Sequence, residues 1–149
     1  MKKILLLFTL CFLTFSVLAI HPHTDHISVS TDKSEIKWKG SKIHKSHEGV
    51  VSIDKGVLMI NHGKLVGGQF SIDMTSIVCT DIESEKKNKY FVDHLKNDDF
   101  FDVENFPTAE IKIIKATPIK SDGGNYMILA DLTIKGITHT ISSETGFRM

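Results

Sequence analysis

The chain has 149 residues, of which 41% are hydrophobic and 24% charged, which is typical of one globular domain. Its 18 basic and 18 acidic side chains balance, so it lacks the positive surplus of a nucleic-acid-binding protein. The only cysteines are Cys11 and Cys79, which excludes the multi-disulfide frameworks of small secreted domains.

The first 19 residues have the pattern of a secretory signal peptide. Lys2 and Lys3 precede an apolar run over 4–18, and Val17 and Ala19 supply the small side chains of a cleavage site. The run is shorter than the roughly 20 apolar residues of a membrane span. We therefore predict cleavage after Ala19 and a periplasmic or secreted protein without a stable membrane span, an uncleaved anchor being the alternative. Without the leader, 16 basic residues face 18 acidic ones.

Residues 20–33 are polar and show no apolar periodicity, which predicts a flexible lead before a domain over 34–149. The lead contains three histidines, His21, His23 and His26. Pro22 has no N–H to give to a tight N-terminal metal site, so we expect only weak, solvated metal affinity there.

From residue 34 onward, alternating and short apolar stretches predict about seven strands. They are 36–41, 50–53, 57–60, 69–74, 108–113, 126–134 and 137–143. Turn residues separate most of them, at Asp54-Lys55-Gly56, Asn61-His62-Gly63-Lys64, Ser121–Asn125 and Lys135-Gly136. Gly67-Gly68 predicts a bulge or bend at the start of its strand.

The period changes to that of a helix over 86–97, where Phe91 and Leu95 are four residues apart. Three phenylalanines follow it, Phe100, Phe101 and Phe106. We expect the helix and these rings to seal one end of the sheet, and a movable lid is the alternative. Many short strands with one short amphipathic helix predict an all-β, antiparallel barrel or sandwich.

Several fragments, in this order, resemble the YceI-like, or polyisoprenoid-binding, family. They are Trp38-Lys39-Gly40, His47–Val50, Gly67–Ile77, Asp81, His94–Val103, Phe106–Ala109 and Leu132–Thr138. The resemblance implies a lipocalin-like barrel around an apolar tunnel in an exported protein. The implied partner is one long apolar lipid, such as a polyisoprenoid, an isoprenoid quinone or a fatty-acid derivative.

The inward-facing apolar side chains of this barrel are the candidate ligand-binding residues. They are Ile36, Trp38, Phe70, Ile72, Met74, Phe91, Ile111, Ile113, Ile128 and Leu132. A filled core would show the same alternation, so the pattern leaves open whether the interior is hollow. The alternative function is a structural or interaction module, or a truncated product, with no small-molecule ligand.

Family members continue past the Leu132–Thr138 fragment with strands that close the barrel, so we expect a barrel that lacks its last strands. Free strand edges would favour edge-to-edge homodimers. No nucleophile elbow, phosphate loop or dinucleotide fingerprint occurs, so we expect neither an enzyme nor a cofactor. No spacing makes His47 and His94 metal ligands, so we expect both to be structural and predict no metal site.

Overall fold

A computed structural model describes residues 23–119 and 124–146. The predicted leader and most of the predicted turn near 121–125 lie outside these residues. The strands are β1 (Thr24–Ser28), β2 (Glu35–Lys42), β3 (Lys45–Asn61), β4 (Lys64–Cys79), β5 (Thr108–Pro118), β6 (Asn125–Ile134) and β7 (Ile137–Gly146). The helices are the short 3₁₀ helix η1 (Thr31–Lys33) and α1 (Glu85–Lys96).

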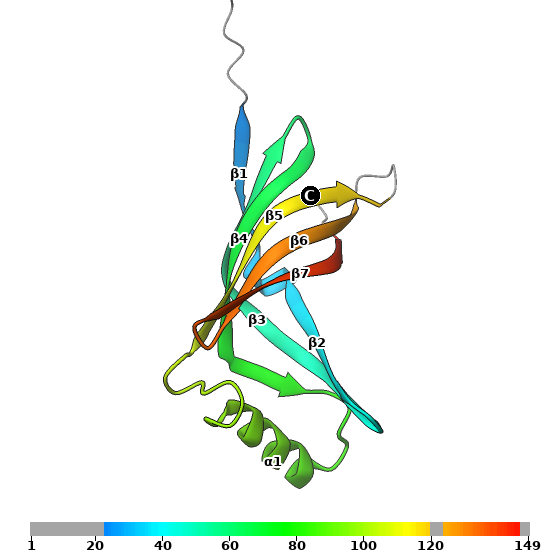
Figure 1. The fold of residues 1–149 in the computed structure, drawn as a ribbon, viewed down its shortest axis with the longest axis vertical. Helices are drawn as coiled ribbons and strands as arrows, with labels where there is room; N and C mark the ends of the chain where they lie inside the picture. The colour runs from blue at the N-terminus through cyan, green and yellow to red at the C-terminus, as the bar shows by residue number, and fades with distance from the viewer. Residues whose placement is uncertain (1–22, 120–123, 147–149) are drawn as a thin grey trace, which may run out of the picture.

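All seven strands form one antiparallel sheet in the order β1-β3-β4-β5-β6-β7, with β2 also paired to β3. β2 pairs with residues 45–52 of β3 and β1 with residues 57–61, so the two lie one after the other along one edge of β3. The sheet curls so that β2 and β7 border its open side (Figure 1). Within the described ranges β2 and β7 do not pair with each other, so the barrel is not closed. The predicted all-β, lipocalin-like antiparallel barrel with one short amphipathic helix is confirmed in this incomplete form.

The predicted turn at Asp54-Lys55-Gly56 is wrong, because β3 continues through it. Ile53 pairs with Ile72 and Lys55 with Ser71, so Asp54 is an extra residue and forms a bulge. A Cβ on Gly56 would lie 2.6 Å from the Phe70 ring, so glycine here permits close packing across the sheet. Asp54-Lys55-Gly56 interrupts the regular strand pattern, and such an interruption is compatible with a bulge as well as with a turn.

Two predicted hairpin turns are confirmed by positive φ angles. His62 and Gly63 have φ of 49° and 72°, and Lys135 and Gly136 have 51° and 73°. This combination is the two-residue turn that matches the twist of paired strands. A third hairpin, between β2 and β3, turns at residues 43–44. Neither residue has a positive φ angle, and this turn was not predicted.

The segment predicted to be a flexible lead contains β1 and η1, and the structure corrects that expectation for residues 24–33. β1 pairs over its whole length with Val57–Asn61. Four of its five residues are exposed. Such a strand is attached by backbone hydrogen bonds rather than by a buried face, so it leaves no apolar alternation in the sequence.

The inner face of the sheet carries two groups of buried residues. The helix-end cluster lies near α1 and comprises Val51, Ile72, Met74, Ile77, Leu95, Val103 and Ala109. The hairpin-end cluster lies toward the β3–β4 hairpin and comprises Leu58, Ile60, Leu65, Ile113, Tyr126, Ile128 and Ala130. Ile111 packs against both clusters, so the apolar interior is continuous.

The predicted helix over 86–97 is confirmed as α1, which lies across one end of the sheet (Figure 1). Leu95 is buried against the helix-end cluster and Phe91 packs beside it. The following loop is held by backbone bonds from Phe101 N to Leu95 O and from Val103 N to Lys96 O. No helix in the described part of the chain is long and apolar enough to cross a membrane.

Candidate functional site: an apolar cavity inside the open sheet

A cavity of about 970 Å³ lies inside the curled sheet. Side chains of β2 to β7, α1 and the Phe100-Phe101 loop line it. Residues 35–42 of β2 and 143–145 of β7 both border it, so the cavity reaches the unpaired side of the sheet. This volume is at the upper end of the range of small-molecule sites.

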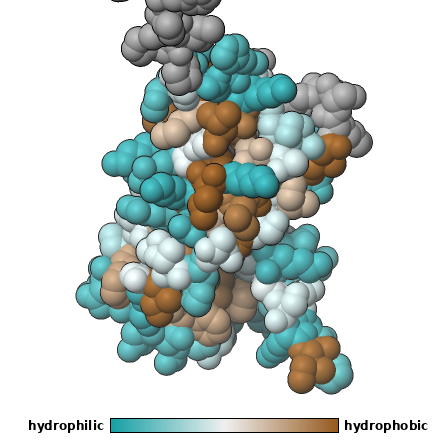
Figure 2. All heavy atoms as spheres, turned by 45° about the horizontal axis from the view of Figure 1, so that its top comes forward, coloured by the Kyte–Doolittle hydropathy of each residue, from teal (hydrophilic) through white to brown (hydrophobic). Residues whose placement is uncertain are grey.

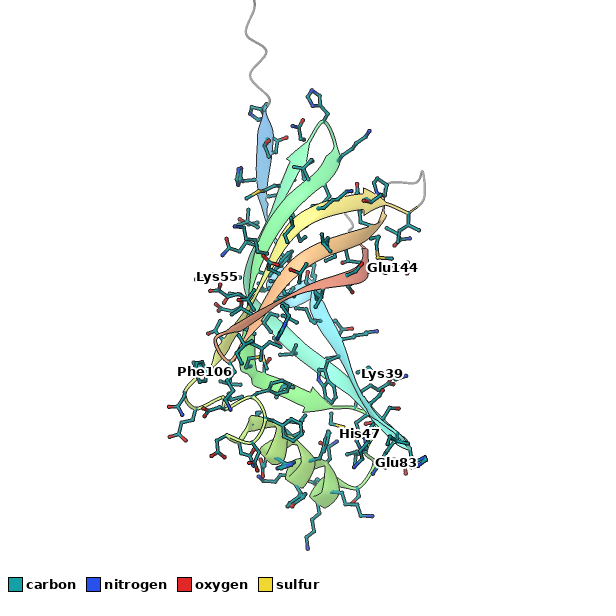
Figure 3. The ribbon with its side chains drawn as sticks, viewed as in Figure 1. Lys39, His47, Lys55, Glu83, Phe106 and Glu144 are labelled. Carbon is teal, nitrogen blue, oxygen red and sulfur yellow. The ribbon has the colours of Figure 1, made fainter. Side chains whose placement is uncertain are left out.

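The cavity has an apolar wall and a charged rim. Its wall is made mainly of aliphatic and aromatic side chains, while the charged residues that line it come from the strand edges and the hairpin. Lys39 on β2 and Glu144 on β7 are two of these rim residues, and both lie on the same side of the molecule (Figure 3). No polar or charged side chain is buried among residues 23–119 and 124–146. The interior therefore provides contact area rather than hydrogen bonds.

The outer surface shows the same division. In Figure 2, apolar side chains gather in a band along the middle of one face, with hydrophilic residues on both sides. Among the described residues, several large apolar side chains on β5 and β6 are exposed, including Ile114, Met127 and Leu129.

The structure brings most of the predicted ligand-binding residues to this cavity. Those that line it are Ile36, Trp38, Ile72, Met74, Phe91, Ile111, Ile128 and Leu132. Phe70 and Ile113 do not line it, and both pack in the hairpin-end cluster. Phe70 and Ile113 share a sheet face with the cavity residues, but they lie farther from α1, within the packed hairpin-end cluster.

Other lining residues were not predicted as site residues. They are chiefly Val51, Ile77, Leu95, Phe100, Phe101, Ala109, Ile134 and Ile141. Ile77 is separated from the alternating run of β4 by a large bulge, because Val50 pairs with Val78 but Ser52 pairs with Asp73, which leaves residues 74–77 opposite one residue of β3. This bulge turns residue 77 inward against the period that holds over 70–74, so strict alternation could not have identified it.

Aromatic rings close the cavity at the helix end. Phe91 lies 6.5 Å from Trp38 and 4.6 Å from His47, measured between ring centroids. Trp38 also donates a 3.2 Å hydrogen bond from Nε1 to the carbonyl oxygen of Val78. In the last turn of α1, His94 packs edge-on against Phe100, with 5.0 Å between the ring centroids. These contacts join α1 to the sheet and form one end wall.

The loop after α1 is tied to the sheet as well as to the helix. Lys135 Nζ donates to the carbonyl oxygen of Asp98 at 2.6 Å, and Lys96 Nζ donates to that of Thr75 at 2.6 Å. Met74 N donates to the carbonyl oxygen of Pro107 at 2.9 Å. Together with the two backbone bonds from Phe101 and Val103 to α1, these three bonds favour a static seal over a movable lid.

His47 and His94 have different partners. The Nδ1 atom of His47 lies 3.2 Å from both carboxylate oxygens of Asp81, and that of His94 lies 3.2 Å from the Asn97 amide. Each ring also packs on a phenylalanine. The two imidazoles therefore belong to separate local networks. That of His47 lies beside the β2–β3 hairpin, and that of His94 lies at the C-terminal end of α1.

These features define a class of protein: a single curled antiparallel sheet with an apolar interior and one sealing helix. The sequence matches the family model of the YceI-like domain over residues 27–148, so the chain belongs to the YceI-like family. No curated protein matches. Among solved structures, the chain is similar to the crystal structure of Burkholderia cenocepacia BcnA, with a TM-score of 0.57 and 23% identity over 78% of this chain and 69% of that chain. At this identity the likeness concerns the fold.

Proposed function

We propose that this protein is an exported, non-enzymatic carrier that holds one long apolar lipid in the cavity. The observation that carries the proposal is an apolar cavity of about 970 Å³ in a domain with no buried charged side chain among its described residues. Each methylene transferred into such a wall contributes about 0.8 kcal/mol, so a long chain can bind without a polar anchor. A polyisoprenoid, an isoprenoid quinone or a fatty-acid derivative has this chemistry.

Export is part of the proposal. A long apolar lipid does not dissolve in water, so outside the cytoplasm it would need a protein carrier. The prediction of export rests on the Lys2-Lys3 start and the apolar run over 4–18. N-terminal sequencing of the exported protein should begin at Ile20. Retention of Met1 in that protein would exclude the predicted cleavage.

The carrier function is tested by filling the cavity. Leu132 lines the cavity and is only partly buried, so Leu132→Trp should fold and should reduce the copurifying lipid several-fold. Ile113 is the matched control, since it is buried and does not line the cavity. Ile113→Trp should destabilise the fold by about 1–3 kcal/mol through overpacking. Organic extraction followed by mass spectrometry measures the lipid, and chemical denaturation measures stability.

The absence of any extracted lipid from the parent protein would contradict the carrier function. An undiminished lipid content in folded Leu132→Trp would contradict lipid binding in this cavity. The first result would favour the alternative, an interaction module that uses the edges of β2 and β7 that are unpaired in the described residues. Light scattering on the same samples would then show an edge-to-edge dimer instead of a monomer.

A further inference from the structure

Three side chains with metal-binding atoms meet where the β2–β3 hairpin approaches the end of β4. His47 lies on β3, Cys79 is the last residue of β4, and Asp81 follows it in the loop toward α1. The Cys79 thiol donates to Asp81 Oδ1 at 3.0 Å, and His47 Nδ1 lies 3.2 Å from the same oxygen. All three ligand atoms lie within 4.8 Å of one another.

These separations suit a tetrahedral ion. Zinc bonds of about 2.0–2.3 Å to nitrogen, oxygen and sulfur place neighbouring ligand atoms roughly 3.3–3.6 Å apart. The two separations from Asp81 Oδ1, 3.0 and 3.2 Å, lie just below this range, and the third separation is at most 4.8 Å, so small side-chain rotations would admit an ion. Thiolate, imidazole and carboxylate form a mixed set that suits zinc better than calcium or magnesium, which prefer oxygen ligands.

The surroundings hold the three ligands in place. Asn88 on α1 donates from its side-chain amide to the carbonyl oxygens of Cys79 and Ile82, at 2.8 and 3.1 Å. The Phe91 ring packs on His47 at 4.6 Å between centroids. Outer contacts of this kind orient metal ligands in known sites. Figure 3 shows His47 beside the hairpin, on the side that faces α1.

The charge balance also suits a divalent ion. Cys79 is buried, and the side chains of His47 and Asp81 are 17% and 30% exposed, so the site is partly desolvated and open on one side. A thiolate and a carboxylate together carry two negative charges, which a divalent cation neutralises. The exposed side leaves room for a water molecule as the fourth ligand of a tetrahedral ion.

The same geometry argues against a nucleophilic cysteine. The thiol of Cys79 donates to Asp81 rather than to an imidazole base. Burial, followed by the hydrogen bond to Asp81, raises the pKa of Cys79. That hydrogen bond lowers the pKa of Asp81, with a smaller contribution from His47 in the same direction. A buried thiol that donates its proton to a carboxylate is a poor nucleophile, whereas metal ions displace the thiol proton.

We propose that His47, Cys79 and Asp81 form a zinc site that joins the β2–β3 hairpin to the end of β4. The site would act on the fold rather than on a substrate, since its ligands come from β3, from the end of β4 and from the loop that leads into α1. It lies beside the proposed lipid site, because His47 also borders the cavity.

The test uses cobalt(II) as a spectroscopic substitute for zinc, added to the exported chain after chelator treatment in a non-thiol reductant. A near-ultraviolet charge-transfer band reports a cobalt–thiolate bond, and Cys79 is the only cysteine outside the predicted leader. Histidines of the N-terminal segment cannot produce this band. We expect saturation at one cobalt per chain, displacement of cobalt by zinc, and a higher melting temperature with zinc.

Variants then assign the ligands. Cys79→Ser should abolish the band, while His47→Gln and Asp81→Asn should weaken zinc affinity about 10–100-fold or more. His62→Gln, in the β3–β4 turn, is the matched control and should bind as the parent does. Circular dichroism checks that each variant folds. If Cys79→Ser does not fold, the variants of His47 and Asp81 still test the site, because these two side chains are partly exposed. Absence of a thiolate band at saturating cobalt, or unchanged affinity in both other variants, would overturn the proposal and leave a hydrogen-bonded cluster only.

Discussion

Replacing Gly49 by alanine should destabilise the fold by about 3 kcal/mol, because the new methyl group has no space. A Cβ at this position would lie 1.9 Å from the carbonyl oxygen of Val78 and 2.7 Å from the Trp38 ring. Both contacts involve atoms that are already engaged, since Trp38 Nε1 donates to that same oxygen. The β3–β4 pairing or the Trp38 ring would have to move.

Gly40→Ala is the matched control for Gly49→Ala. Gly40 is also a strand glycine, but it is exposed, and a Cβ there would meet nothing within 4 Å. Its replacement should change stability by about 0.5 kcal/mol or less, with a tendency to stabilise because alanine restricts the unfolded chain. Urea denaturation followed by fluorescence measures both, and Trp38 is the only tryptophan in the chain. Equal midpoints for the two variants would show that the sheet yields at Gly49.

Ile72→Asp should cost about 3–5 kcal/mol, which is a large share of the 5–15 kcal/mol that stabilises a typical domain. Ile72 is 4% exposed and belongs to the helix-end cluster. An ionised carboxylate there would have no charged partner, since no charged residue is buried in the described chain. We expect loss of the cooperative thermal transition, measured by circular dichroism, and loss of copurifying lipid.

The control for Ile72→Asp lies on the same strand with its side chain on the opposite face. Gln69 is exposed, so Gln69→Asp introduces the same charge into solvent. It should cost about 1 kcal/mol or less, which reflects the poor strand propensity of aspartate. A similar loss in both variants would mean that β4 tolerates aspartate at neither position, so that burial of Ile72 would not be the cause.

Because the sheet is not closed, the domain has both an apolar cavity and two strand edges, those of β2 and β7, that do not pair with each other in the described residues. Both strands border the cavity. A bound lipid would cover apolar side chains that this opening exposes to water. We therefore expect ligand binding to stabilise this fold, by linkage to the folded state.

Local physics in the sequence determined the main elements. The alternation over 69–74 follows from the two-residue period of a strand with one buried face. The spacing of Phe91 and Leu95 predicted α1, and Lys135-Gly136 predicted a turn that needs two positive φ angles. Each of these signals comes from residues close together in the chain. The family resemblance also lay in the sequence, and the family match confirms it.

Tertiary structure decided everything that depends on distant segments. Asp54 forms a bulge and not a turn because β4 continues alongside β3, which no local pattern records. Phe70 packs in the hairpin-end cluster while Ile72 lines the cavity, because the curl of the sheet separates two residues of the same face. Cys79 and His47, whose separation in the sequence carries no metal-binding spacing, meet only through strand pairing. Burial and proximity are properties of the folded sheet, so the hollow interior and the proposed zinc site could be recognised only from the structure.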